Sequence, residues 1–385
     1  MTLTSISRGF PEAEFVARTA RAQTSMAHVG LDGILLMTEA EVQYFTGFQT
    51  LFWQSPTRPW FVYIPASGKP IAIIPEIGAS LMQRSWLDDI RTWAAPAPDD
   101  DGISLLTDLL LSQSVVGVMK GHETQLRMPL GDWERLMAAL PALEFKDATG
   151  LVQGLRMVKS EAEIEKIEHI CAIGSETFAQ VPQFARAGVP LDDVFREFRR
   201  EALAQGADGA PYLVGASSQG GYADVISPPD TTPLTHGDVL MLDTGLVWDG
   251  YHCDFDRNWA IGKAHDAAKQ AYDVLWRATQ AGIEAARPGN TCRDLFDVMS
   301  RIIATLDDSG GDIGRLGHGL GLQLTEQPSH AAFDTTQLTE NMVLTLEPSL
   351  SYGDGLMMVH EENIVVTQQG GRLLSTRAAV ELPVI

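Results

Sequence analysis

The segment LMLDTGLVWDGYHCDFDRNWAIG, residues 240–262, constrains the fold most, because four aspartates interrupt an otherwise apolar, strand-like stretch. Aspartate is a poor strand residue, and a carboxylate that leaves water costs free energy unless another group compensates its charge. Asp243 and Asp254 lie on either side of Gly250, so two strands joined in a hairpin would bring both carboxylates close together. The segment therefore predicts paired strands that need a buried positive charge.

Three further segments each contribute a candidate ligand from surroundings that look buried. His318 stands between two glycines in GRLGHGLGL, Glu347 ends the apolar strand of LTLEPS, and Glu361 lies inside the strand-like MMVHEENIVVT. With Asp243 and Asp254 they form a set of four carboxylates and one imidazole, which suits two closely spaced divalent cations. We expect Mn²⁺, with Fe²⁺, Co²⁺ or Zn²⁺ as alternatives, because bound metal ions would make the buried acids tolerable.

The composition argues against several classes of protein. A formal net charge of −22 disfavours nucleic acid and anionic membranes as partners, because both bind basic surfaces. No apolar run is long enough to predict a membrane-spanning helix, and residues 1–15 lack the basic start and apolar centre of a signal peptide. The three cysteines are an odd, widely spaced set that argues against a disulfide framework. We therefore expect a cytoplasmic protein.

The length of 385 residues predicts two or three domains. Helix-like and short strand-like segments mix in residues 1–156, which is typical of an α/β domain. The pattern changes near Met157, where we place the domain boundary. Ser160 and Glu163 form a capping box there, which predicts a long helix to about Val181. Residues 157–385 then combine helices with the acidic strands, which predicts an α+β domain.

Taken in order, DTGLVWDGYHCDFDRN, GHGLGL, LEPS and HEEN resemble the pita-bread metallopeptidase family M24, which contains prolidase, aminopeptidase P and methionine aminopeptidase. GLDGILLMTEAEVQYFTGF is similar to the extra N-terminal α/β domain of the prolidase, aminopeptidase P and creatinase branch. The resemblance implies a creatinase-like domain over residues 1–156 and a pita-bread metal-binding catalytic domain over 157–385. It implies two metal ions held by Asp243, Asp254, His318, Glu347 and Glu361, with Asp254 and Glu361 bridging them. Because all five positions match, the creatinases themselves, which have lost the metal site, are disfavoured.

The activity implied by the resemblance is that of a dinuclear-metal-dependent hydrolase similar to Xaa-Pro dipeptidase and aminopeptidase P. A metal-activated water would attack an amide bond, and Glu347 would carry protons. Three accessory positions depart from this pattern, since Ile226, Thr325 and Val359 stand where the family peptidases carry His, His and Arg. Losing donors of that kind typically costs about 10²–10³ in rate. The alternatives are a divergent dipeptidase, an enzyme on a small metabolite, such as the dimethylsulfoniopropionate lyase of the same fold, and a silent binding protein.

Seven residues are candidates for the pocket that binds a dipeptide or another small molecule: Tyr212, Tyr251, Arg315, Thr325, His330, His360 and Trp53. Thr325, His330 and His360 could replace the missing donors. Asp256 shares the face of Asp254, and we expect it either to support the metal ligands from behind or to form a salt bridge, with Arg257 as the candidate partner. Trp53 belongs to an aromatic-rich segment, residues 48–61, that we expect to be an exposed loop. The resemblance suggests that such a loop reaches the active site of the partner in a homodimer, with ordinary domain packing as the alternative.

Overall fold

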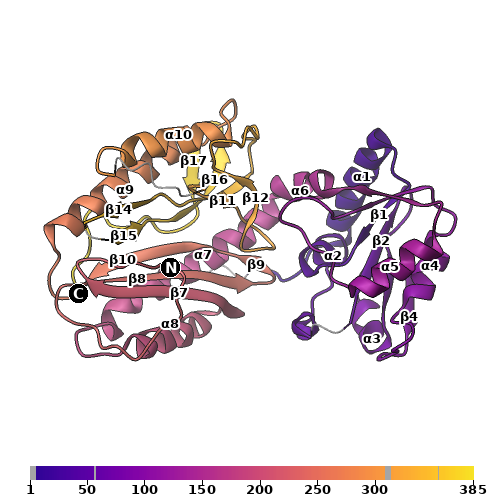
Figure 1. Cartoon of the computed structure of the whole chain (residues 1–385), viewed down its shortest axis with the longest axis horizontal. Coiled ribbons are helices and arrows are strands. Elements are labelled where there is room, and N and C mark those ends of the chain that lie inside the picture. Colours follow the sequence, from indigo (N-terminus) through magenta and orange to yellow (C-terminus); the bar gives the residue numbers. More distant parts are fainter. Residues whose placement is uncertain (1–5, 56–57, 308–313, 354) are drawn as a thin grey trace. The chain divides into compact units, whose positions relative to one another are not determined.

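The computed structural model describes residues 6–55, 58–307, 314–353 and 355–385 of the chain. It separates into two compact units, of which one is Ser7–Arg156 and the other is built mainly from Met157–Ile385 (Figure 1). Each unit has its own sheets and its own helices. Among the described residues, no helix combines the length and apolarity that crossing a bilayer requires.

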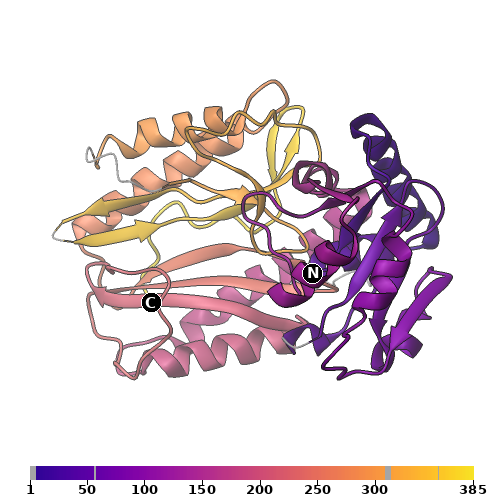
Figure 2. The same cartoon turned by 45° about the vertical axis from the view of Figure 1, so that its right-hand side comes forward.

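The unit Ser7–Arg156 is built on a six-stranded sheet in the order β4-β3-β2-β1-β5-β6, with helices packed around it (Figure 2). Its elements are α1 (Glu12–Val29), β1 (Gly33–Leu36), α2 (Glu39–Thr46), η1 (Leu51–Gln54), β2 (Phe61–Pro65), β3 (Ile71–Pro75), η2 (Glu76–Gly78), α3 (Ala79–Met82), β4 (Asp89–Trp93), α4 (Ile103–Leu110), β5 (Val115–Val118), α5 (Leu130–Ala139), β6 (Glu144–Asp147) and α6 (Thr149–Met157). Strand β2 runs antiparallel to both β1 and β3, and the other pairs are parallel. The α/β prediction for this part of the chain is therefore confirmed.

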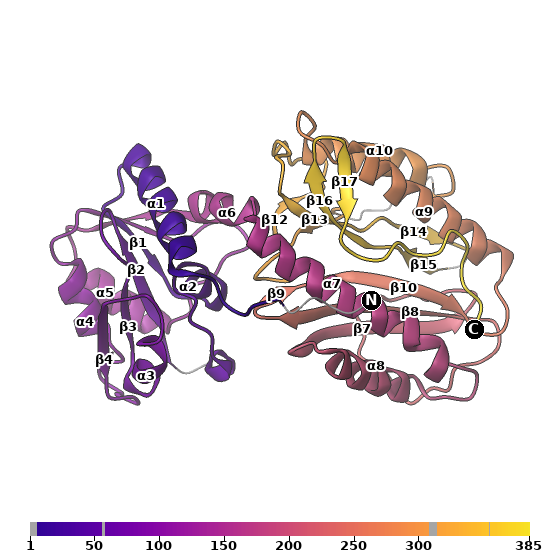
Figure 3. The same cartoon turned by 180° about the vertical axis from the view of Figure 1, so that it is seen from behind.

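The second unit contains a sheet of order β10-β8-β7, with β9 paired to β8, a sheet of order β12-β11-β13-β16-β17, and a β14-β15 hairpin. Its elements are α7 (Glu161–Phe184), α8 (Leu191–Gln205), β7 (Gly209–Gln219), β8 (Asp238–Trp248), β9 (Tyr251–His252), β10 (Phe255–Ala260), α9 (Asp266–Ala285), α10 (Cys292–Ile303), β11 (His318–Gly319), β12 (Glu326–Ser329), β13 (Val343–Leu346), β14 (Ser349–Tyr352), β15 (Leu356–Val359), β16 (Glu362–Thr367) and β17 (Gly370–Leu373). Helices α7 and α8 cover the first sheet, and α9 and α10 lie against the second, as Figures 1 and 3 show. The predicted α+β domain is confirmed.

The long helix and the acidic hairpin both form where the sequence predicts them. Helix α7 begins after Ser160, whose hydroxyl accepts a hydrogen bond from the Glu163 N–H at 3.3 Å while the Glu163 carboxylate accepts one from the Ser160 N–H. Strands β9 and β10 both pair antiparallel with β8, and Asp249 and Gly250 have positive φ angles of 51° and 82° in the turn that joins β8 to β9. Such a turn matches the right-handed twist of the two strands. Helix α10 was not predicted.

Candidate metal centre

Four of the five predicted metal ligands lie at or beside the ends of strands, and the fifth lies in the middle of one. Asp243 is within β8, Asp254 directly precedes β10, His318 begins β11, Glu347 directly follows β13, and Glu361 directly precedes β16. Asp243 faces Asp256 across the β8–β10 ladder, and residues two positions apart on a strand share a face, so Asp254 lies on the same side. Glu361 was expected inside a strand and instead occupies the break between β15 and β16.

Three of these side chains converge closely. One ligand atom each from Asp254, His318 and Glu361 lie within 4.8 Å of one another. His318 Nε2 is 3.5 Å from Asp254 Oδ2 and 3.9 Å from Glu347 Oε2. Asp243 belongs to the same group, because its charge contributes to the raised pKa of both Asp254 and Glu361. Four of the five residues are buried, whereas the side chain of Glu347 is 33% exposed and reaches solvent.

Burial and mutual repulsion shift the pKa values of all four acids upwards. Burial first, and then the Glu347 carboxylate, raises the pKa of Asp243 to about 7. Burial raises the pKa of Glu347 to about 7, against the opposing charge of Arg315. Burial and the neighbouring acids hold the pKa of Asp254 and of Glu361 well above the ordinary range. The cluster therefore carries more negative charge than the surrounding protein groups neutralise.

The imidazole of His318 adds a lone pair to this group of acids. Its Nδ1 lies 2.8 Å from the Gly319 carbonyl oxygen, which assigns the proton to Nδ1 and leaves Nε2 as an acceptor. Burial lowers the pKa of His318 to about 4, so the ring is neutral at pH 7. When Asp254 is ionised, Nε2 and Asp254 Oδ2, 3.5 Å apart, are two acceptors that face each other. A cation between them satisfies both.

Unpaired oxygens show that the donor set fits divalent metal ions. Within the described residues, Asp243 Oδ1 and Glu361 Oε1 are buried and have no hydrogen-bond partner. A buried carboxylate oxygen without a partner costs free energy unless a cation binds it. Carboxylate oxygens and one neutral imidazole nitrogen are ligands that Mn²⁺, Fe²⁺, Co²⁺ and Zn²⁺ accept.

Two of the predicted pocket residues lie beside this cluster. The Tyr212 hydroxyl contacts Asp243 and lowers the pKa of that carboxyl, while Arg315 lowers the pKa of Asp254 and Glu347 through its charge. Their roles in binding remain predictions. His330 lies near His318, but its ring is fully buried and its Nε2 donates to the Thr345 carbonyl oxygen at 3.0 Å.

The placement of the other pocket candidates does not support a substrate role. Thr325 is exposed in the connection between β11 and β12. The buried Tyr251 hydroxyl donates to Glu163 Oε1 at 2.9 Å. The buried ring of His360 contacts α9, with Nδ1 3.0 Å from the Thr279 hydroxyl. His360 thus points away from the acidic cluster, because it is the neighbour of Glu361 and neighbouring side chains on an extended chain alternate in direction.

The expectation of an exposed aromatic loop is wrong for most of its aromatic residues. Trp53 is 7% exposed and lies in the unit Ser7–Arg156, where its ring centroid is 5.7 Å from that of Trp60. Phe48 and Phe61 are also buried, and Arg127 lies over the Trp53 ring. Packing of these rings against one another removes them from water, whereas Leu51 stays 83% exposed.

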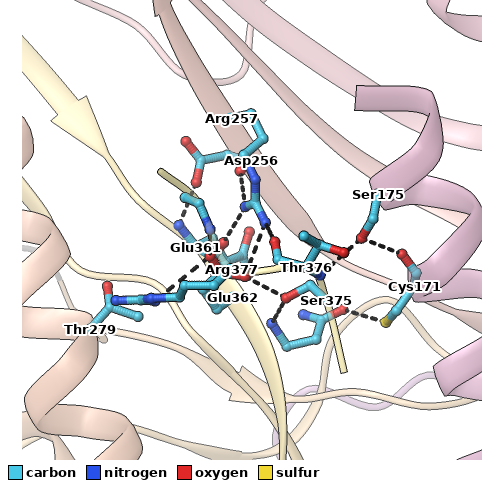
Figure 4. Close-up of polar contacts among 12 residues, drawn as sticks. Cys171, Ser175, Asp256, Arg257, Thr279, Glu361, Glu362, Ser375, Thr376 and Arg377 are labelled. Atoms are coloured by element: carbon cyan, nitrogen blue, oxygen red, sulfur yellow. Dashed lines mark hydrogen bonds and ion pairs between the residues drawn. The ribbon is translucent and has the colours of Figure 1, made fainter. Parts of the chain in front are cut away.

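Of the two roles expected for Asp256, the salt bridge with Arg257 does not form among the described residues, whereas the supporting role agrees with its contacts. Asp256 accepts hydrogen bonds from the N–H of Glu361 and from Asn258 Nδ2, and Arg257 pairs with Glu362 at 3.1 Å (Figure 4). Sequence reasoning missed Glu362 and Asn363, which follow Glu361 directly. Their position in HEEN was the signal that could have revealed them. On an extended chain Asn363 lies two residues after Glu361 and therefore on the same face.

Comparisons with known proteins agree with the predicted resemblance. The sequence model of Metallopeptidase family M24 matches residues 165–368, and that of the Creatinase/Prolidase N-terminal domain matches residues 18–158. The probable dipeptidase PepE of Mycobacterium tuberculosis is 27% identical over 98% of this chain and 99% of its own length. An Xaa-Pro dipeptidase of Pyrococcus horikoshii is 26% identical over 64% of this chain and 71% of its own.

Solved structures show the same two-unit fold. The crystal structure of dipeptidase PepE from Mycobacterium ulcerans has a TM-score of 0.84 at 26% identity, covering 98% of this chain and 99% of that one. The X-Pro aminopeptidase from Thermotoga maritima, at 24% identity and 95% and 99% coverage, has a TM-score of 0.80 and supports the fold alone. The chain therefore belongs to Metallopeptidase family M24 and carries a Creatinase/Prolidase N-terminal domain.

Proposed function

We propose that this chain is a two-metal hydrolase of short peptides, with Xaa-Pro dipeptides as the first candidate substrates. The observation that carries the proposal is the convergence of Asp254, His318 and Glu361 within 4.8 Å, beside buried carboxylate oxygens that have no partner among the described residues. Family membership and the dipeptidase relatives support hydrolysis of a peptide bond. Residues 157–385 would carry the chemistry and residues 1–156 would form the N-terminal domain.

The proposed ligands are Asp243, Asp254, His318, Glu347 and Glu361, with Asp254 and Glu361 shared between two ions, and Mn²⁺ is the metal we expect. Bound divalent ions supply a water of lowered pKa and polarise a carbonyl group. The protein contributes the fixed positions of the acids and the neutral tautomer of His318, whose Nδ1 is held by the Gly319 carbonyl oxygen. A ring held in this way keeps Nε2 directed at the acids.

Glu347 is our candidate for the group that moves a proton. Its side chain is the most exposed of the five, and burial raises its pKa to about 7. A carboxylate that reaches solvent beside the bound metal ions is placed to exchange a proton with a water molecule. Arg315 is our candidate for the carboxylate of a dipeptide, because its cationic charge already acts on Asp254 and Glu347.

A second candidate function is the elimination or hydrolysis of a small zwitterionic metabolite. The chain lacks the accessory His and Arg side chains of the family peptidases at Ile226, Thr325 and Val359. Ile226 is 74% exposed, Thr325 is exposed, and Val359 is buried. A substrate without a peptide carbonyl has less need for donors at these positions, and this observation favours the second candidate.

The test is a substrate panel assayed with purified protein and added Mn²⁺. Xaa-Pro dipeptides, dipeptides without proline and dimethylsulfoniopropionate are incubated with wild type, with Asp254→Ala, and with Asp297→Asn as an exposed-aspartate control on α10. We expect wild type and Asp297→Asn to release proline, chelator to abolish this release, and added Mn²⁺ to restore it. Asp254→Ala should release no proline. Acrylate release would favour the metabolite enzyme, and full turnover after chelation or in Asp254→Ala would refute the metal mechanism.

We also propose that the protein acts as a cytoplasmic homodimer. The proposal rests on the family resemblance of the segment 48–61, in which the side chain of Leu51 is 83% exposed in the single chain and available to a partner. Light scattering of the purified protein measures the mass. A monomer with full activity would refute the dimer.

A further inference from the structure

The two proposed bridging residues lie outside the strand ladders, so their main-chain groups need other partners. Asp254 falls between β9 and β10, and Glu361 falls between β15 and β16. Both residues are buried, at 5% and 1% exposure. A buried N–H or C=O without a partner costs free energy, and water has little access to these positions. Side chains from the facing segment provide the missing hydrogen bonds.

Asn363 satisfies both main-chain groups of Asp254. Its Oδ1 accepts a hydrogen bond from the Asp254 N–H at 2.9 Å, and its Nδ2 donates to the Asp254 carbonyl oxygen. The Cys171 thiol donates to the same Oδ1 at 3.3 Å, which is consistent with this orientation of the amide. Asn363 is completely buried and lies two residues after Glu361. The segment that carries one bridging acid therefore holds the main chain of the other.

Asp256 and Arg257 perform the reciprocal task for Glu361. The Asp256 carboxylate accepts a hydrogen bond from the Glu361 N–H, and Arg257 Nη1 donates to the Glu361 carbonyl oxygen at 3.1 Å (Figure 4). Asn258 Nδ2 donates to the second Asp256 oxygen at 2.6 Å and fixes the carboxylate. Asp256 lies two residues after Asp254.

We infer that Asn363, Asp256 and Arg257 are positioning residues that set the separation of the two bridging carboxylates. The inference rests on the proposed metal role of Asp254 and Glu361. Each bridging residue is tied by its main chain to a side chain from the segment of the other, so neither can move without breaking contacts to its counterpart. When both acids are ionised and no cation is present, their repulsion drives them apart, and the crossed hydrogen bonds oppose that movement. The site is thereby held ready for the metal ions.

The test replaces Asn363 by Leu and by Asp and measures Mn²⁺ binding by titration calorimetry. Leucine keeps the branching at Cγ and removes both hydrogen bonds to Asp254, whereas aspartate keeps the acceptor for the Asp254 N–H and loses the donor. The matched control is Thr177→Val on α7, which removes one fully buried hydroxyl that donates to the Ile173 carbonyl oxygen at 2.8 Å. Calorimetric unfolding of each metal-free variant establishes that it is folded at the titration temperature.

We expect Asn363→Leu to weaken binding of at least one Mn²⁺ by about 10–100-fold, Asn363→Asp to weaken it less, and Thr177→Val to leave it unchanged. The visible spectrum of Co²⁺-loaded protein should change in the Asn363 variants and not in the control. If Asn363→Leu does not fold, the Mn²⁺ affinities of Asn363→Asp and Thr177→Val are compared instead, and weaker binding by Asn363→Asp alone supports the positioning role.

Two outcomes would overturn the inference and are distinguishable. Wild-type affinity and an unchanged Co²⁺ spectrum in the folded Asn363 variants would refute the positioning role and leave the proposed function intact. Wild-type protein that binds no Mn²⁺ or Co²⁺ would refute the proposed function, and the positioning role with it.

Discussion

Replacing Asp243 by Asn should stabilise the metal-free protein at alkaline pH, although it removes a proposed ligand. Asp243 is 9% exposed, its Oδ1 lacks a hydrogen-bond partner among the described residues, and its pKa is raised from 3.8 to about 7. The folded state therefore binds this proton more tightly than the unfolded state does. The associated stability is complete below about pH 4 and is lost as the pH rises to about 7. At about 1.4 kcal/mol for each pKa unit, the loss at pH 8 amounts to about 4 kcal/mol.

Asparagine carries no charge to bury, so the variant avoids this loss at pH 8 and gains little at pH 4.5. Guanidinium unfolding in the presence of chelator measures the free energy of unfolding at pH 8 and at pH 4.5, with Asp297→Asn as the exposed control on α10. Excess Mn²⁺ at pH 8 should make wild type more stable than Asp243→Asn, because metal binding stabilises only a chain that retains the ligand. Equal stability of wild type and Asp243→Asn at pH 8, or an equal gain at both pH values, would refute the reasoning.

Four further predictions concern the same unit of the chain. Mn²⁺ affinity should fall as the pH drops below about 7, because the carboxyls of Asp243 and Glu347 have a pKa of about 7 and must release protons on binding. Calorimetry in buffers of different ionisation enthalpy counts those protons, and an affinity that does not depend on pH would contradict the expectation. Gly317→Ala should cost more than about 2 kcal/mol of unfolding free energy and weaken Mn²⁺ binding, because φ is +132° and a Cβ would overlap the Thr345 carbonyl oxygen. A midpoint of chemical unfolding at the wild-type denaturant concentration would contradict this prediction. Tyr251→Phe should lose about 1 kcal/mol of stability and keep kcat/KM, because the hydroxyl bonds to Glu163; a large fall in kcat/KM would restore Tyr251 as a candidate for the substrate pocket. Arg315→Met should raise KM for dipeptides more than it lowers kcat, and steady-state kinetics with unchanged KM would exclude Arg315 as the carboxylate anchor.

Local chemistry made part of this molecule predictable. The Asp249–Gly250 turn and the Ser160 capping box act within a few residues, so the hairpin and α7 follow from short stretches of sequence. The candidate ligands were visible because aspartate and glutamate are out of place in apolar strands. Nothing local, however, reveals that Trp53 packs against Trp60 or that His360 contacts Thr279 on α9. Those contacts depend on segments that meet only in the folded chain.

The crossed hydrogen bonds around Asp254 and Glu361 illustrate the same limit and also explain how the acids stay available. Asn363 and Arg257 donate to main-chain carbonyl oxygens of the bridging residues and not to their carboxylates. The main chain is therefore fixed while Glu361 Oε1 keeps no hydrogen-bond partner among the described residues. Had these donors bonded the carboxylates directly, the buried charges would be satisfied by protein and the pKa values would fall. A cation would then gain little by binding. The arrangement thus combines rigid ligands with unsatisfied oxygens, and both properties favour binding of a divalent ion.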